Sequence, residues 1–466
     1  MKIGFYGAAR TVTGSKHLIT LDSGKKILLD CGMFQGRGKK TFPKNSQFAI
    51  TPKEIDYIIL SHAHIDHSGI LPKFVKEGFR GKIYCTSGTA DLCEIMLLDS
   101  AHIQVSDVEF INKQREREGK DLLEPLYSVE DVYKTLPLFK EITYNHDFKI
   151  DEEVRVQFTD AGHILGAAVV NLTIHEGNQV KKLAYTGDIG RYINKVLRKP
   201  QPFPQADYII CEGTYGDRLH EGVEEMSKKL QQIVEETCVM KKGKLIVPAF
   251  SIGKTQELVY TLNKLHFEKK LPKIKVYVDS PLAINATEIM KRHSECFSRE
   301  TLDFMKKDPD PFGFNGLYYI RDVEASKAIN QRDEPCIIIS ASGMATAGRI
   351  RHHLSNEVGN PRNSVLIIGF AEEGSLADRL ARGDKKVPIF GHEHDVEADV
   401  YKLDFFSAHA DYKELIRFLS CQNPALVKKT FLVHGNEDVL LKFKERLHDE
   451  GYSSVLVPRE EEVFNI

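Results

Sequence analysis

The segment IDYIILSHAHIDHSGILPKF, residues 55–74, decides the fold of this chain. Within it His62, His64, Asp66 and His67 lie on the turn between a predicted strand and a predicted helix. Three imidazoles and a carboxylate are costly to crowd together unless a cation holds them, and nitrogen with carboxylate ligation suits zinc. Because the adjacent Asp66 and His67 point in different directions from a helix start, the four side chains do not all converge on one ion. The segment therefore predicts two metal ions.

Further ligands are expected at the ends of other strands, where a rigid sheet can aim them. His163 in FTDAGHILGAA follows one predicted strand, Asp188 in LAYTGDIG follows a second, and His434 in TFLVHGNED follows a third. Taken singly, His163 and Asp188 are each better explained by a structural role. Their order along the chain and their places at strand ends favour metal binding.

The length and the pattern of the chain predict more than one domain. The chain has 466 residues and 42% hydrophobic residues, whereas a single core stops growing at about 250–300 residues. Short β-rich runs and turns fill residues 1–205, and nearly continuous apolar strands that alternate with helical patterns fill residues 206–395. Such strands are typical of a parallel sheet covered on both faces. Short strands return in residues 396–466.

Charge and cysteine content restrict the partners and the compartment. The 64 basic and 66 acidic residues nearly cancel, so a nucleic acid would have to be bound by a local basic groove. The eight cysteines include no C-x-x-C pair and predict free thiols in a reducing compartment. No apolar signal core follows the first lysine, and no apolar run approaches the roughly 18–20 residues that span a bilayer. We expect a soluble cytoplasmic protein without a membrane partner.

The order of these motifs resembles the ligand set of the metallo-β-lactamase superfamily: HAHIDH, then a histidine after AG, then TGD. The resemblance implies an α/β fold, an αββα sandwich, with two zinc ions per chain. The first zinc would be bound by His62, His64 and His163, the second by Asp66, His67 and His434, and both by Asp188. Asp30, at the end of KKILLDCG, matches the early aspartate that supports the ligands.

The long interval between Asp188 and His434 resembles the β-CASP nucleases, in which an α/β cap domain is inserted into the metallo-β-lactamase fold. Three family motifs match Glu212 in CEGTYGD, His409 in FFSAHAD and His434 in LVHGNED. Similarity also covers GFYGAARTVTGS, VPAFSIGKTQEL, VYVDSPLA and SASGMATAGRIRHHL. It is strongest with bacterial and archaeal relatives of the cleavage and polyadenylation nuclease subunit. It implies a β-CASP cap at 206–395 and a metallo-β-lactamase domain formed by 1–205 and 396–466.

This resemblance implies a zinc-dependent endonuclease that hydrolyses single-stranded RNA with a metal-activated hydroxide. A histidine at the third motif, here His434, is associated with members that process RNA. Catalysis is assigned to Asp66, to His409 as general acid, and to Glu212, which holds and charges His409. The resemblance leaves a homodimer open as an assembly.

Two turns in the cap are predicted to contact RNA phosphates, because helix starts present free N–H groups to anions. They contain Ser251, Gly253 and Lys254 in one turn and Ser342, Gly343 and Arg349 in the other. The triplet GKT does not complete a P-loop, since Pro248 stands where its first glycine is required. For His352 and His353 a packed helix face is at least as well supported as a position that lines the cleft, and for His392 and His394 we favour an exposed hairpin over half of a metal site.

Three alternative functions remain open at this point. A hydrolase of this fold can act on a small ester, thioester or lactam, and a related nuclease can act on DNA. A non-catalytic scaffold would be recognised by missing ligands, and this chain has lost none of those that the resemblance assigns.

Overall fold

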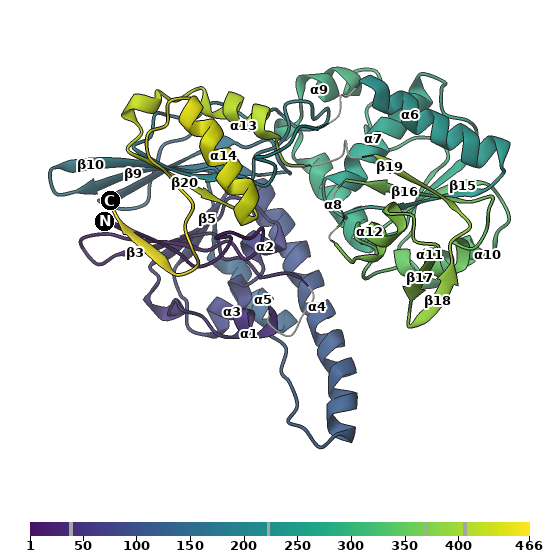
Figure 1. Cartoon of the computed structure of the whole chain (residues 1–466), viewed down its shortest axis with the longest axis horizontal. Helices are drawn as coiled ribbons and strands as arrows, with labels where there is room; N and C mark the ends of the chain where they lie inside the picture. The colour runs from purple at the N-terminus through teal and green to yellow at the C-terminus, as the bar shows by residue number, and fades with distance from the viewer. Residues whose placement is uncertain (37–40, 221–223, 370, 372, 404–407) are drawn as a thin grey trace. The chain divides into compact units, whose positions relative to one another are not determined.

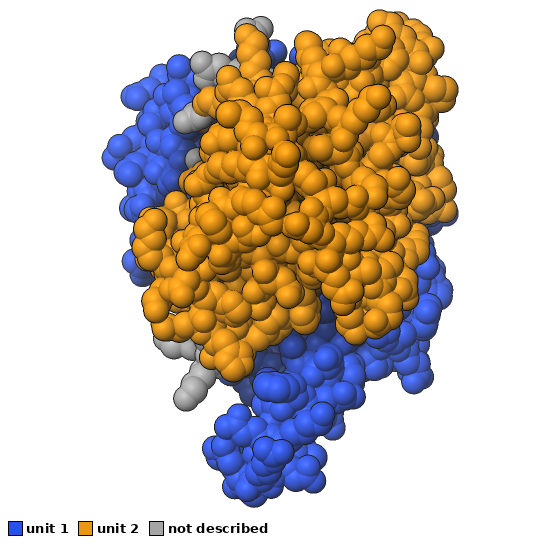
Figure 2. All heavy atoms as spheres, turned by 90° about the vertical axis from the view of Figure 1, so that its right-hand side faces the viewer, with its two compact units in different colours: residues 1–192, 199–219, 409–466 blue, residues 193–198, 220–408 orange. Residues whose placement is uncertain are grey.

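The computed structural model describes residues 1–36, 41–220, 224–369, 371, 373–403 and 408–466. They form two compact units, which Figure 2 shows in blue and orange. The first unit consists of Met1–Tyr192, Lys199–Leu219 and His409–Ile466, and the second of Ile193–Arg198 and His220–Ala408. Residues 405–407 of the segment FFSAHAD lie outside the described residues, whereas His409 lies within them.

The first unit is built on two seven-stranded sheets. One sheet has the order β22-β1-β2-β3-β4-β5-β6, formed by Glu462–Asn465, Lys2–Phe5, His17–Thr20, Lys26–Leu29, Tyr57–Ile59, Lys82–Cys85 and Phe139–Glu141. The other has the order β21-β20-β11-β10-β9-β8-β7, formed by Val455–Leu456, Lys429–Val433, Tyr208–Glu212, Gln179–Tyr185, Ala168–Glu176, Val154–Asp160 and Phe148–Lys149.

The main core of this unit lies between the two sheets. Ile27 and Ile59 of the first sheet belong to the same buried cluster as Val156, Leu172 and Phe431 of the second. In Figure 1, α13 and α14 cover the second sheet, while α3 and α5 lie outside the first. The expected αββα sandwich is therefore confirmed. The helices of this unit are Thr41–Ser46 (α1), Ile65–Ser68 (α2), Leu71–Lys76 (α3), Ser87–Arg117 (α4), Val129–Thr135 (α5), Tyr412–Leu419 (α13) and Glu437–Asp449 (α14).

The second unit is an open α/β domain around a six-stranded sheet of order β14-β13-β15-β12-β16-β19. All neighbouring pairs in this sheet are parallel. Its strands are Leu317–Tyr319, Lys275–Val278, Cys336–Ser340, Lys244–Pro248, Ser364–Ile368 and Asp399–Leu403, and a hairpin is formed by Lys386–Ile389 (β17) and His392–Asp395 (β18). Its α-helices are Glu224–Val234 (α6), Lys254–Phe267 (α7), Pro281–Arg292 (α8), Arg299–Met305 (α9), Val323–Gln331 (α10), Ile350–Glu357 (α11) and Leu376–Ala381 (α12).

Two strands lie in a different unit from the one that the sequence pattern predicted. β11, which we expected in the cap, pairs in parallel with both β10 and β20 of the first unit. β19, which we expected after the cap, pairs in parallel with β16 and forms the edge of the cap sheet. An apolar run shows that a strand is buried, but it does not identify the sheet that buries it. The cap accordingly begins at His220 and ends at Ala408, apart from Ile193–Arg198.

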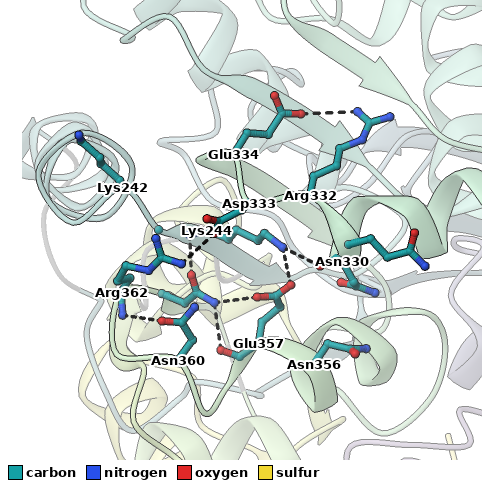
Figure 3. Close-up of a pocket in the computed structure, with 13 residues that line it drawn as sticks. Lys242, Lys244, Asn330, Arg332, Asp333, Glu334, Asn356, Glu357, Asn360 and Arg362 are labelled. Atoms are coloured by element: carbon teal, nitrogen blue, oxygen red, sulfur yellow. Dashed lines mark hydrogen bonds and ion pairs between the residues drawn. The ribbon is translucent and has the colours of Figure 1, made fainter.

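A polar cavity of about 260 Å³ opens where β12 begins in the cap (Figure 3). The ammonium group of Lys244 donates to the carbonyl oxygen of Asn330 at 3.1 Å and pairs with the Glu357 carboxylate. Arg362 pairs with Asp333 at 2.8 Å. These charged groups neutralise one another, so we interpret the cavity as a structural network at the edge of the sheet opposite the predicted phosphate-binding turns.

The structure contains a long helix, α4, which extends beyond the sheets in Figure 1. Its Thr86 side chain caps the amino end by accepting a hydrogen bond from the Thr89 N–H at 3.3 Å. Among the described residues, no helix combines the length and the apolar composition that crossing a bilayer requires.

Candidate metal centre

The predicted ligands lie on turns that follow strands of the first unit. His62 to His67 come after β4, His163 after β8, Asp188 after β10 and His434 after β20. His434 has a φ of 52°, in the left-handed region, and Asp30, directly after β3, has a φ of 58°. A non-glycine residue in this region costs on the order of 1 kcal/mol, and such strain is found where contacts at functional sites fix the backbone.

One group of candidate ligand atoms combines three histidines with one aspartate. His62, His64, His163 and Asp188 offer atoms that all lie within 4.8 Å of one another. The His64 Nδ1 atom is 3.1 Å from Nε2 of His62 and 3.2 Å from Nε2 of His163. Burial lowers the pKa of His64 to about 3 and also lowers the pKa of His62 and of His163. The imidazoles are therefore neutral and offer lone pairs, as metal ligands must.

A second group consists of Asp66, His67 and His434, whose candidate ligand atoms also lie within 4.8 Å of one another. The Oδ2 atom of Asp66 is 3.2 Å from Nε2 of His434 and 3.8 Å from Nε2 of His67.

Asp188 faces both groups with one carboxylate. Its Oδ2 atom is 3.4 Å from Nε2 of His62 and 3.5 Å from Nε2 of His163. Its Oδ1 atom is 3.3 Å from Nε2 of His67. This is the position that a carboxylate shared between two ions requires.

Two buried atoms at the centre fit a cation. Within the described part of the chain, His67 Nε2 and Asp188 Oδ1 have no hydrogen-bond partner. A buried polar atom left unpaired costs about 1–3 kcal/mol. A metal ion bound between an imidazole nitrogen and a carboxylate oxygen offsets that cost, so the residues present fit the predicted metal.

Asp30 lies behind the second group and orients it. Its Oδ2 atom is 2.6 Å from Nδ1 of His67 and accepts hydrogen bonds from Tyr185 Oη at 2.6 Å and Ser61 Oγ at 2.7 Å. A hydrogen bond from Nδ1–H leaves the Nε2 lone pair of His67 free for a metal. The sequence analysis did not single out Ser61 or Tyr185, although Ser61 directly precedes His62 and Tyr185 ends β10.

Glu212 and His409 form a pair next to the first group. The His409 Nδ1 atom is 3.2 Å from Glu212 Oε2 and 3.4 Å from Oε1, and the Glu212 carboxylate also accepts the Ile189 N–H. Burial lowers the pKa of His409, but the Glu212 carboxylate outweighs this effect and raises the pKa to about 9. His409 is therefore a cation at neutral pH, and its side chain is 20% exposed. It can donate a proton to a bound molecule.

Atom positions alone do not separate metal binding from proton donation at His409. Asp188, Glu212, His409 and His434 also offer atoms that lie within 4.8 Å of one another. The two roles predict different effects of removing His409, because a metal is lost if His409 is a ligand and is retained if His409 is only the acid.

The two cap turns lie at the same edge of one sheet. Ser251 and Gly253 lie between β12 and α7, and Lys254 is the first residue of α7. Ser342, Gly343 and Arg349 lie between β15 and α11, and β12 and β15 are parallel neighbours. Lys254 is buried, with its ammonium group 3.6 Å from the Glu257 carboxylate. Arg349 donates to buried Asp279 at 2.6 Å and to the Arg321 carbonyl oxygen at 2.7 Å. Both charged side chains are thus engaged inside the cap, which the turn sequences did not indicate.

Replacing Arg349 with alanine is expected to lower the free energy of unfolding by about 3 kcal/mol, because it removes the arginine partner of the buried Asp279 carboxylate, which keeps, among the described residues, only its contacts with His353 and Ser326. Urea unfolding measures this change. Arg382→Ala, which removes an exposed arginine 3.5 Å from Asp378, is the matched control and should change the free energy by about 0.5 kcal/mol or less. Unchanged stability together with weaker RNA binding would instead assign Arg349 to phosphate, as the sequence predicted.

The remaining cap histidines have the structural surroundings that we favoured. His353 is buried and lies 2.7 Å from the Asp279 carboxylate and 2.8 Å from the side-chain oxygen of Asn330. His392 and His394 lie on the β17–β18 hairpin. The metal-ligand groups found among the described residues do not include any of these histidines.

Three family models match the chain. The model described as the metallo-beta-lactamase superfamily matches residues 13–217, the Beta-Casp domain matches residues 255–380, and the Zn-dependent metallo-hydrolase RNA specificity domain matches residues 393–458. The first of these regions contains the predicted ligands from His62 to Asp188, and the third contains His409 and His434.

Several characterised proteins are similar over nearly the whole chain. Ribonuclease TTHA0252 of Thermus thermophilus is 36% identical over 451 residues, which cover 97% of each chain. An RNase J-like protein of Methanocaldococcus jannaschii is 30% identical over 443 residues, covering 94% of this chain and 93% of that protein. The transcription termination factor FttA of the same organism is 28% identical over 467 residues, covering 98% of this chain and 70% of that protein.

Proposed function

Because this chain belongs to the β-CASP family of metallo-β-lactamase-fold hydrolases, we propose that it is a zinc-dependent ribonuclease that cleaves single-stranded RNA, mainly as an endonuclease. One observation carries this proposal: His409, paired with Glu212, lies directly beside the candidate metal ligands, with 3.9 Å between His409 Nδ1 and Asp188 Oδ2. The match to an RNA specificity domain and the similarity to two ribonucleases favour RNA over a small ester, thioester or lactam.

We propose two zinc ions per chain. The first is bound by His62, His64 and His163, the second by Asp66, His67 and His434, and both by Asp188. The two groups of candidate ligands on either side of the Asp188 carboxylate support this number. When bound, zinc supplies Lewis acidity that lowers the pKa of water and stabilises negative charge on phosphate oxygens.

The chain's own residues deliver the proton that the leaving group needs. His409 donates it to the departing ribose 3′-oxygen, which leaves a 3′-hydroxyl on one product and a 5′-phosphate on the other. Glu212 keeps His409 charged and holds its ring in place. Asp30 fixes the orientation of His67, and Asp66 contributes as a ligand.

The proposal includes a reducing, cytoplasmic location, which the eight free cysteines support. Neither the relatives nor the single chain supports a homodimer, and we do not propose one. We also propose that the backbone and hydroxyl groups of the two cap turns, at Ser251, Gly253, Ser342 and Gly343, contact the RNA phosphates, since Lys254 and Arg349 are engaged elsewhere.

The purified protein should cleave RNA at least about tenfold faster than DNA of the same sequence, because a site that hydrogen-bonds a ribose 2′-hydroxyl loses that contact with DNA. Internally labelled and 5′-labelled single strands measure both the rate and the position of cleavage. A metal chelator should abolish cleavage of the RNA and of the DNA. Equal rates on RNA and DNA would contradict the RNA assignment, and faster turnover of a chromogenic ester or lactam would favour the small-molecule alternative.

A further inference from the structure

Thr214 lies in the turn CEGTYGD. This turn connects the segment that carries His434 to the segment that carries His409. The Gly213 N–H donates to the Val433 carbonyl oxygen at 2.9 Å, directly before His434. Tyr215 forms a parallel β-bridge with Asp411, two residues after His409. The backbone of this turn is therefore fixed on both sides of Thr214.

The Thr214 hydroxyl contacts both a candidate metal ligand and the acid of the proton-donating pair. Its Oγ1 atom is 2.6 Å from Glu212 Oε2 and 2.9 Å from His434 Nδ1. The His434 carbonyl oxygen also lies within 2.9 Å. A threonine hydroxyl has one proton to donate, and a hydrogen bond to a carboxylate is stronger than one to a neutral carbonyl. Thr214 therefore donates to Glu212 and accepts from His434.

This direction of hydrogen bonding fixes the tautomer of His434. If Nδ1–H donates to Thr214, the proton is on Nδ1 and the Nε2 atom carries a lone pair. The Nε2 atom is the one that faces the second group of ligands, at 3.2 Å from Asp66 Oδ2. The hydroxyl thus prepares His434 to bind a metal through Nε2.

The same hydroxyl holds the Glu212 carboxylate in place. Oε2 receives the Thr214 hydroxyl and Oε1 receives the Ile189 N–H. Between these two fixed oxygens lies the His409 Nδ1 atom, and the His409 ring stacks at 5.7 Å on the His434 ring with an interplanar angle of 25°. Hydrogen bonds therefore connect His434 to His409 through Thr214 and Glu212.

We propose that Thr214 is a positioning residue that sets the tautomer of His434 for the second metal and holds Glu212 for His409. This inference rests on the proposed function for the roles of those two histidines. It assigns Thr214 itself no contact with substrate. Only the hydroxyl group of Thr214 makes these hydrogen bonds, so a serine at this position should position His434 and Glu212 equally well.

Thr214→Val keeps the shape of the side chain and removes the hydroxyl. Loss of such a supporting hydrogen bond typically weakens metal binding by about 10-fold to 100-fold. We expect one of the two zinc dissociation constants, that of the ion held by His434, to rise by that factor in Thr214→Val, while the other stays unchanged and Thr214→Ser resembles the wild type. Titration of the metal-free protein with zinc, in competition with a chromophoric chelator, measures both constants without RNA.

Thr430→Val is the matched control, because Thr430 is buried on β20 and its hydroxyl has no hydrogen-bond partner among the described residues. It should leave both zinc constants unchanged. Nitrogen-15 spectra of the zinc-loaded wild type and Thr214→Ser should show His434 protonated at Nδ1. Wild-type zinc binding by Thr214→Val, or an equal loss in Thr214→Ser, would overturn the proposal. Because these measurements use no RNA, they test the role of Thr214 separately from the proposed ribonuclease activity.

Discussion

Replacing Asp188 with alanine is expected to abolish RNA cleavage and to leave the protein with fewer than two bound metal ions. The first candidate ligand group loses a member and the second loses the carboxylate that faces it, since Oδ2 faces His62 and His163 and Oδ1 faces His67. An imidazole carries no negative charge, so the remaining histidines cannot replace the carboxylate. We expect the cleavage rate to fall at least about a thousandfold, more than for a supporting residue. Elemental analysis of the purified protein and the rate on labelled RNA measure the two effects.

Asp147→Ala is a suitable control for this experiment. It removes an exposed carboxylate that lies 2.8 Å from Arg155, on the same polypeptide unit. It should retain both metal ions and the wild-type rate. If Asp188→Ala keeps two metals per chain after zinc reconstitution, Asp188 is not the shared ligand.

Replacing His409 with alanine is expected to leave both metal ions in place and to slow RNA cleavage by about a hundredfold or more, the usual effect of losing a positioned general acid. Glu212→Gln should have a milder effect, because it removes the charge that raises the pKa of His409 and keeps the shape of the side chain. His434→Ala should instead weaken or remove the second metal. Zinc content and single-turnover rates of the three variants separate these outcomes.

A substrate with sulfur in place of the scissile 3′-oxygen gives a direct test of proton donation. The thiolate leaves without a proton, so this substrate should restore the rate of His409→Ala but not that of His434→Ala. Loss of metal from His409→Ala would show that His409 is a ligand, and failure of the sulfur substrate to restore its rate would show that His409 is not the acid.

The pH dependence of the wild type should reflect the same group. His409 must be protonated to act, and Glu212 raises its pKa to about 9 against the opposing effect of burial. Nearly all of the enzyme therefore has a protonated His409 well below that pH, and the cleavage rate falls as the pH rises through about 9. In Glu212→Gln the decline should begin at a lower pH. An alkaline limb at the same pH in both proteins would assign it to another group.

The candidate ligands could be predicted from the sequence because they are dense, ordered and tied to strand ends. Four of them lie within the six residues of HAHIDH, and a turn after a strand fixes the side chains it carries, whatever surrounds it. The nearly continuous apolar runs likewise predicted the parallel sheet of the cap, whereas the αββα sandwich was expected from the resemblance of the ligand motifs to a known family. These features depend on local spacing, which a sequence displays directly.

The structure alone decided which side chains meet across the fold. The apolar pattern of β11 fits either sheet, and only its pairing with β10 and β20 places it in the first unit. Arg349 looked available to phosphate until the structure showed its ion pair with Asp279.

Thr214 shows the same limit most clearly. It lies two residues from Glu212 but 220 residues from His434, and its hydroxyl contacts both. The sequence by itself predicted the fold class and the candidate ligands, because their motifs consist of neighbours along the chain, and it predicted Glu212 and His409 through the resemblance of their segments to family motifs. Tertiary structure decided the boundary of the cap, the engagement of Arg349 and the contacts of Thr214, because hydrogen bonds and ion pairs depend on distances that distant segments acquire only when they pack.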